Sequence, residues 1–188
     1  MTTSIMIVGV GGQGTLLASK LLGNVLIAQG YDVKLSEVHG MSQRGGSVVT
    51  YVKYGDKVYS PIVDQGEADY ILSFEILESA RWISYLKEGG VLLTNTQKTW
   101  PMPVITGAME YPEDIVAKLS AKADVLAVDA LSLAEQAGSP KAVNVVLIGV
   151  LSRRMDIPEE AWLKAIEETV PPKFLELNRK AFRLGREA

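Results

Sequence analysis

The sequence contains no cysteine and only one histidine, His39, in 188 residues. Without thiols the chain forms no disulfide and holds no cysteine-ligated zinc ion or iron–sulfur cluster. A single histidine also excludes a histidine pair as a metal site. No serine lies in a G-x-S-x-G nucleophile motif. We therefore predict no catalytic residue and no metal ligand in this chain, so a redox centre has to belong to another polypeptide.

Positive charge and long apolar runs are scarce as well. The formal net charge is −3, which disfavours a nucleic-acid partner because proteins that bind nucleic acids carry a basic face. The longest apolar stretch, VNVVLIGVL at residues 143–151, is far shorter than the roughly 20 residues that span a bilayer. The amino end lacks the basic segment of a secretory signal. We expect a cytoplasmic protein that binds neither membrane nor nucleic acid.

The chain has the size and patterning of one α/β domain over residues 1–188, since it shows no internal repeat and no linker-like segment. Strand-like runs alternate with helical patterns, and the part after Leu131 is helical throughout. We predict a Rossmann-like three-layer α/β/α sandwich with a mostly parallel sheet and a helical C-terminal third. The predicted strands cover residues 4–8, 32–38, 47–54, 57–63, 69–74, 90–94 and 124–128. The predicted helices cover residues 15–29, 75–90, 111–123 and 142–155, one that starts at Pro158, and 173–185.

One pair of strands leaves no room for a crossover helix. Gly55 and Asp56 stand between the strand-like runs 47–54 and 57–63, where a two-residue turn with glycine first would go. We therefore expect an antiparallel hairpin inserted into the sheet.

A glycine-rich segment follows the first predicted strand and opens the first predicted helix. Gly9, Gly11 and Gly14 fit the pattern G-x-G-x-x-G in the context that a dinucleotide site requires. Such glycines let the backbone approach a phosphate at the start of a helix. A tight turn in a packed α/β domain needs glycines without any ligand, and the sequence leaves both interpretations open. The candidate phosphate-binding residues are Gly9, Gly11, Gly12, Gln13, Gly14 and Thr15.

An acidic residue stands where a dinucleotide fold binds ribose. Glu37 follows Gly14 by 23 residues, at the end of the second predicted strand. It could accept hydrogen bonds from ribose hydroxyls, or it could be a solvated carboxylate at a strand end.

A second glycine-containing loop comes directly after this strand, at the edge where open α/β sheets bind ligands and partners. Gln43 offers a donor and an acceptor, and Arg44 a planar guanidinium suited to phosphate or carboxylate. The loop could bind a substrate or coenzyme, form an interface, or only connect two strands. Its candidate residues are His39, Gly40, Met41, Ser42, Gln43, Arg44, Gly45 and Gly46.

Four segments together resemble one known family. GVGGQG at 9–14, SEVHGMSQRGGSV at 36–48, DYILSFEILESAR at 69–81 and NRKAFRLGRE at 178–187 are similar to the gamma-type subunit or domain of 2-oxoacid:ferredoxin oxidoreductases. The likeness covers nearly the whole chain. The form HGMSQRGG at 39–46 resembles most the small beta subunit of the indolepyruvate members.

The resemblance implies the oxidative decarboxylation of an aryl 2-oxoacid to an acyl-CoA and CO2, with ferredoxin as electron acceptor. It places thiamine diphosphate and the iron–sulfur clusters on a larger partner subunit, which would meet ferredoxin, and makes coenzyme A a co-substrate. This chain would be inactive alone. The lack of cysteine agrees with that division.

Three interpretations stay open from the residues themselves. In the first, the two glycine loops line the approach of coenzyme A in a larger enzyme, because a helix start and Arg44 suit its phosphates. In the second, the chain is a free-standing dinucleotide-binding module or sensor that uses Gly9–Gly14 and Glu37. In the third, it is a structural adaptor. The sequence does not fix the 2-oxoacid, the stoichiometry or the role of residues 95–111.

Overall fold

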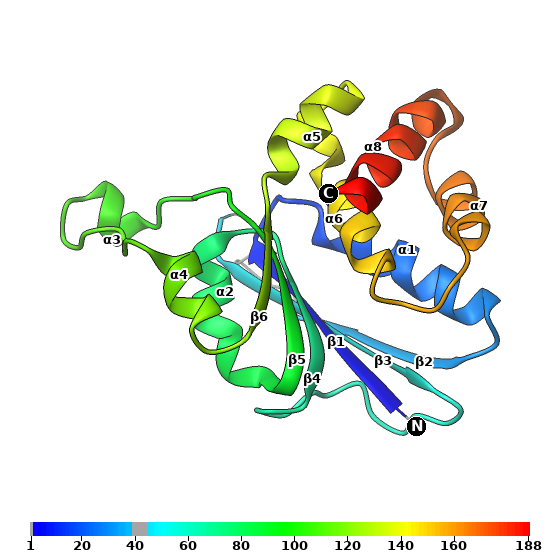
Figure 1. Cartoon of the computed structure of the whole chain (residues 1–188), viewed down its shortest axis with the longest axis horizontal. Coiled ribbons are helices and arrows are strands. Elements are labelled where there is room, and N and C mark those ends of the chain that lie inside the picture. The colour runs from blue at the N-terminus through cyan, green and yellow to red at the C-terminus, as the bar shows by residue number, and fades with distance from the viewer. Residues whose placement is uncertain (1, 39–44) are drawn as a thin grey trace.

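The structure, a computed structural model, describes residues 2–38 and 45–188. Six strands form one sheet in the order β2-β3-β1-β4-β5-β6 (Figure 1). Strands β1, β4, β5 and β6 are parallel neighbours, and β3 runs antiparallel to both β1 and β2. The strands are β1 (Thr2–Val10), β2 (Asp32–Glu37), β3 (Ser47–Gly55), β4 (Ala68–Ser73), β5 (Leu86–Asn95) and β6 (Asp124–Val128).

Helices cover both faces of the sheet, which confirms the predicted α/β/α layers (Figure 1). Helices α1 and α5–α8 lie on one face, and α2 and α4 on the other. None of the helices in the described residues is long and apolar enough to cross a membrane. The helices are α1 (Thr15–Ala28), α2 (Ile76–Trp82), α3 (Met102–Ile105), α4 (Ile115–Ser120), α5 (Ala130–Ala137), α6 (Val143–Ser152), α7 (Glu159–Thr169) and α8 (Leu175–Glu187), with single 3-10 turns at Ile83–Tyr85, Pro140–Ala142 and Pro172–Phe174.

The central strand β1 shows why both faces are covered. Ile5 and Ile7 belong to the larger apolar cluster, with α1 and the C-terminal helices. Met6 and Val8 belong to the smaller cluster, with α2 and α4. All four side chains are fully buried, because alternate residues of a strand point to opposite faces. The uninterrupted apolar run of this strand is thus the signature of a sheet buried on both sides.

The antiparallel part of the sheet is real, but the predicted hairpin is wrong. Strand β3 pairs with β1 on one side and with β2 on the other, so neither of its edges is free for residues 57–63. Those residues form no strand, and Pro61 there has no amide to donate to a ladder. The carboxylate of Asp32 instead accepts a hydrogen bond from the amide of Val58, at 2.9 Å.

Two helix boundaries also differ from the prediction. The helix expected over 75–90 ends at Trp82, and β5 already begins at Leu86. Gly90 packs so closely on the neighbouring strand that an added Cβ would lie 2.9 Å from the Ala68 carbonyl oxygen. At Gly90, strand pairing thus outweighs the local helical pattern. The second difference is in helix α4, which begins at Ile115 rather than at the proline three residues earlier.

Helices α6 and α8 cross in close contact because each has a glycine at the crossing. An added Cβ on Gly149 would lie 2.2 Å from the Phe182 carbonyl oxygen, and one on Gly185 would lie 2.0 Å from the Val146 carbonyl oxygen. Both distances are shorter than any van der Waals contact, and both neighbours are backbone atoms that cannot turn away. The glycine in the segment NRKAFRLGRE therefore has a packing role.

We predict that Gly185→Ala destabilises the protein by about 2–3 kcal/mol, the cost of forcing a helix pair apart in a packed core. Gly23→Ala is the matched control within α1, because its added Cβ would meet only the Leu35 Cδ1 atom at 3.9 Å. That substitution should stabilise the protein by roughly 0.5–1 kcal/mol through helix propensity. Urea unfolding of both variants measures the difference, and equal effects would contradict the packing role.

Candidate functional site

The first glycine loop lies at the carboxyl edge of the sheet, between β1 and α1. Gly12 and Gly14 have φ angles of +99° and +86°, a region that side chains other than glycine rarely adopt. Gly14 is also the cap residue of α1, and it offers no side chain to the first amides of the helix. Those amides and the helix dipole make this end of α1 suited to an anion.

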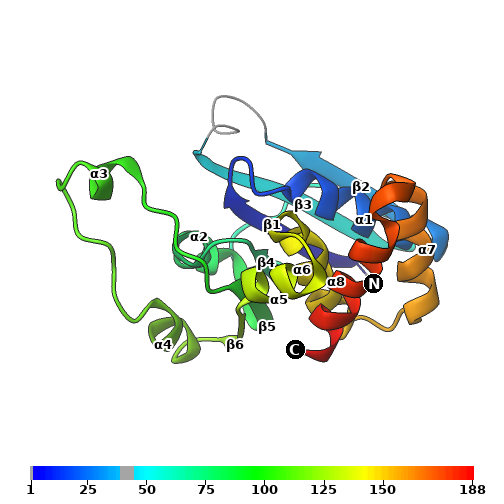
Figure 2. The same ribbon diagram turned by 90° about the horizontal axis from the view of Figure 1, so that it is seen from above.

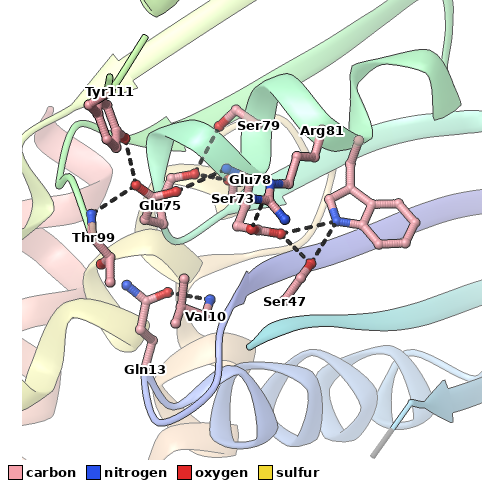
Figure 3. A network of polar contacts seen from close by, with 11 residues as sticks. Val10, Gln13, Ser47, Ser73, Glu75, Glu78, Ser79, Arg81, Thr99 and Tyr111 are labelled. Carbon is pink, nitrogen blue, oxygen red and sulfur yellow. Dashed lines mark hydrogen bonds and ion pairs between the residues drawn. The ribbon is translucent and has the colours of Figure 1, made fainter. Parts of the chain in front are cut away.

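The side chain of Gln13 holds the loop in shape. Its Oε1 accepts a hydrogen bond from the Val10 amide at 2.8 Å (Figure 3). Its Nε2 donates to the Phe74 carbonyl at 3.4 Å. Gly9 has no room for a side chain, because an added Cβ would lie 2.9 Å from both Gln13 Oε1 and Phe74 Cβ. Gly9 and Gln13 therefore determine the shape of the loop. Gly12 faces open space, because an added Cβ there would have no atom within 4 Å.

Clefts open on both sides of this loop. One, of about 270 Å³, is lined by Gly11, Gly12, Gly14 and Thr15 and by the apolar residues Leu16, Val38, Val48 and Val49. The other, of about 460 Å³, lies between the loop and the start of α6, and it includes Gln97, Lys141 and Asn144. Asn144 packs against Gly14 and donates to its carbonyl at 3.4 Å. Except for Gly9, the predicted phosphate-binding residues thus border open space, with apolar surface on one side and a lysine on the other.

Glu37 lies at the end of β2, as predicted, but its carboxylate faces α1. Its Oε1 accepts a hydrogen bond from Ser19 Oγ at 2.7 Å. The antiparallel strand β3 also separates β2 from β1, whereas in a classical dinucleotide fold these two strands are neighbours. This geometry does not favour Glu37 as a ribose ligand.

Of the second loop, residues 39–44 lie outside the described residues, and with them the predicted positions His39, Gly40, Met41, Ser42, Gln43 and Arg44. The described end of the loop touches the first loop, since Gly11 donates its amide to the Gly46 carbonyl at 2.9 Å. Gly45 has a φ of +93°. Val38, at the other end, donates to the Val49 carbonyl at 3.1 Å and lines the smaller cleft. The two predicted loops therefore meet at one edge of the sheet.

Glu75, which the sequence analysis did not single out, has an almost completely buried side chain. Its Oε2 caps α2 by accepting from the Glu78 amide at 2.9 Å. Its Oε1 accepts from the Thr99 amide at 2.9 Å and from the Tyr111 hydroxyl at 2.8 Å (Figure 3). Three donors thus satisfy one buried carboxylate, as a buried charge requires.

A second buried carboxylate, Glu78, holds the end of the second glycine loop. Its Oε2 accepts hydrogen bonds from Ser47 Oγ, directly after Gly46, and from Trp82 Nε1 (Figure 3). Its Oε1 forms an ion pair with Arg81, at 3.4 Å from Nε. A signal for these two residues was present in the sequence. Glu75 and Glu78 stand three residues apart directly after a predicted strand, and this spacing is typical of residues that cap the start of a helix. Both carboxylates are engaged with protein donors. Glu75 holds Thr99 and Tyr111 at the two ends of the connection 99–111, and Glu78 holds Ser47 at the end of the second glycine loop.

Among the described residues no group of three or more acidic or histidine side chains could hold a metal ion. The arrangement offers amides, a lysine and apolar surface rather than a reactive group. Such an arrangement suits a ligand that carries both an anionic group and an apolar part.

Burial and the nearby Glu75 carboxylate raise the pKa of Tyr111 well above its ordinary value of 10. The folded state therefore keeps this proton at a pH where the unfolded chain loses it. The contribution to stability is complete below about pH 10 and is lost as the pH rises further. We predict that Tyr111→Phe costs about 1 kcal/mol at pH 8. Urea unfolding measures the free energy of unfolding of the variant and of the wild type. The difference between the two should become smaller from pH 8 to pH 11. A difference that does not change with pH would contradict the role assigned to the Tyr111 hydroxyl.

Comparison with known proteins identifies the family. Residues 4–188 match the family model of the pyruvate ferredoxin/flavodoxin oxidoreductases. Subunit IorB of indolepyruvate oxidoreductase from Thermococcus kodakarensis is 46% identical over 191 residues, which cover 98% of this chain and 95% of that protein.

Two solved structures share the fold. Subunit PORC of pyruvate oxidoreductase from Thermotoga maritima superposes with a TM-score of 0.78 at 25% identity, over 99% of this chain and 96% of that chain. The 2-oxoglutarate:ferredoxin oxidoreductase from Magnetococcus marinus, solved with 2-oxoglutarate, coenzyme A and succinyl-CoA, superposes at 0.75 and 17% identity, over 99% of this chain and 30% of that longer chain. These matches confirm the resemblance seen in the four sequence segments. The chain belongs to the pyruvate ferredoxin/flavodoxin oxidoreductase family, as a gamma-type subunit.

Proposed function

We propose that this chain is the small subunit of an indolepyruvate or related arylpyruvate:ferredoxin oxidoreductase. The enzyme would convert the 2-oxoacid, coenzyme A and oxidised ferredoxin into an acyl-CoA, CO2 and reduced ferredoxin. The observation that carries the proposal is the 46% identity to an indolepyruvate oxidoreductase subunit over almost the full length of both chains. The larger subunit would hold thiamine diphosphate and the iron–sulfur clusters, which agrees with the absence of cysteine here.

Within that enzyme, we assign the carboxyl edge of this chain to the approach of coenzyme A. Coenzyme A combines phosphate groups with an aromatic base and an apolar arm, and the clefts beside the glycine loop combine helix-start amides with apolar walls. Lys141 supplies a positive charge on the far side of the loop, and Arg44 follows Gln43 in the second loop. Both cations suit phosphate groups.

The alternative, a free-standing dinucleotide-binding module, rests on Glu37. The hydrogen bond from Ser19 and the separation of β2 from β1 speak against it, because the ribose of a classical dinucleotide would meet a carboxylate beside the first strand. The absence of cysteine also means that the chain by itself holds no cysteine-ligated iron–sulfur cluster.

Anaerobic reconstitution tests the proposed function directly. The chain, tagged and mixed with the larger subunit from the same host, should co-elute with thiamine diphosphate and iron. The complex should reduce a low-potential dye with indolepyruvate and coenzyme A, and each subunit alone should not. A chain that elutes only with itself, or a complex without arylpyruvate activity, would contradict the proposal.

A matched pair of glycine substitutions tests the coenzyme A site. Gly12 and Gly30 both have positive φ and nothing within 4 Å of an added Cβ, but Gly30 lies beyond the opposite end of α1. Alanine at either position should cost roughly 1–2 kcal/mol of stability through backbone strain. Only Gly12→Ala should raise the KM for coenzyme A, by about tenfold, which corresponds to roughly 1.4 kcal/mol of binding energy. Equal KM values in the two assembled variants would refute this role of the loop.

A further inference from the structure

Residues 99–111 form an arm that leaves the sheet after β5 and returns to it before α4. In Figures 1 and 2 the arm, with the single-turn helix α3, extends away from the rest of the molecule. The sequence left the role of this connection open. A connection of this length without regular strands or long helices in a compact domain usually has a function.

The arm exposes an unusual share of apolar surface. Of the twelve large apolar side chains exposed in the described part of the chain, four lie within ten residues here. They are Trp100, Met102, Ile105 and Met109, with exposed fractions between 60% and 65%. The arm has a single charged residue, Glu110. Exposed tryptophan and methionine with little charge are typical of the centre of a protein interface.

The tip of the arm is already folded. The amides of Val104 and Ile105 donate to the Pro101 carbonyl, and the amide of Met109 donates to the Pro103 carbonyl at 3.0 Å. The two prolines also restrict the backbone of the tip. A segment with this internal order loses little conformational entropy when a partner binds it, so more of its apolar burial contributes to affinity.

The base of the arm is tied to the site described above. One carboxylate oxygen, Glu75 Oε1, accepts hydrogen bonds from Thr99 at the start of the arm and from Tyr111 at its end. The neighbouring Phe74 carbonyl accepts the hydrogen bond of Gln13 from the glycine loop. The arm and the glycine loop are therefore held by two consecutive residues at the same edge of the sheet.

We propose that the arm is a docking element for the larger subunit of the same enzyme, which would receive its apolar tip in a groove of complementary apolar character. The inference rests on the proposed function, in which coenzyme A approaches along this carboxyl edge. Because coenzyme A would react at the thiamine diphosphate of the larger subunit, that subunit would face the same edge. The glycine loop and the arm would then be parts of one continuous interface.

A second copy of this chain is the competing occupant. The nine exposed residues of the arm are less than half of the roughly 20–30 residues that each side of a stable interface needs. An interface made of two arms would therefore be too small for a stable dimer. The glycine loop adjoins the arm at this edge, so a larger subunit that covers both would bury more surface than the arm alone provides. In the Magnetococcus marinus enzyme this fold is also joined to further oxidoreductase sequence in one chain.

The test compares two double variants of the full chain for binding to the purified larger subunit. Met102→Ser with Ile105→Ser removes apolar surface from the arm. Ile27→Ser with Ile62→Ser removes similarly exposed apolar surface near the opposite edge of the sheet. The Kd for the larger subunit should rise about 30-fold or more in the arm variant, as for an interface hot spot, and stay within about twofold in the control. Circular dichroism and thermal unfolding establish that both variants fold.

The possible outcomes separate this inference from the proposed function. A folded arm variant with wild-type affinity would overturn the docking role and leave the subunit assignment intact. A wild-type chain that does not bind the larger subunit at all would overturn both. If sedimentation shows a wild-type dimer and a monomeric arm variant with unchanged affinity for the larger subunit, the occupant is a second copy and the proposal is wrong.

Discussion

The turn between β4 and α2 fixes the geometry on which the functional edge of the molecule depends. The Phe74 carbonyl accepts from Gln13 of the glycine loop and from the buried Asn95 at the end of β5. The Glu75 carboxylate accepts hydrogen bonds from the first turn of α2 and from Thr99 and Tyr111 at the two ends of the arm. A buried carboxylate without hydrogen-bond donors would destabilise the folded state. The donors to Glu75 therefore stabilise one another's positions. Four segments that are distant in sequence are thereby held as one surface.

This rigid edge suits a subunit that carries no reactive group of its own. A chain without cysteine can contribute binding, orientation and the exclusion of water, but it cannot carry electrons through iron–sulfur clusters. The features suited to binding are the backbone amides at the start of α1, the apolar lining of the clefts and the exposed arm. The composition and the geometry of the chain thus agree with the proposed division of labour between a small binding subunit and a larger catalytic subunit.

The alternation of strands and helices was enough to predict the α/β/α layers, because buried strands and amphipathic helices carry strong local signals. The partner of β3 was not predictable in this way, since the pairing is decided by which edges remain free in the assembled sheet. The glycine loop was found from its spacing, but Glu75 was missed. Its importance comes from Thr99 and Tyr111, which lie 24 and 36 residues further along the chain. Contacts between residues so far apart in the chain produce no periodic pattern that can be detected in the sequence.

The central claim is that the carboxyl edge of the sheet faces the partner subunit. Amide hydrogen exchange of the chain, alone and in complex with the larger subunit, tests it most directly. The account predicts slower exchange in the complex at residues 11–16 and 100–109, with unchanged exchange on α7 and at the edge strand β2. Protection confined to α7 and β2, with no change at the glycine loop or the arm, would contradict the account.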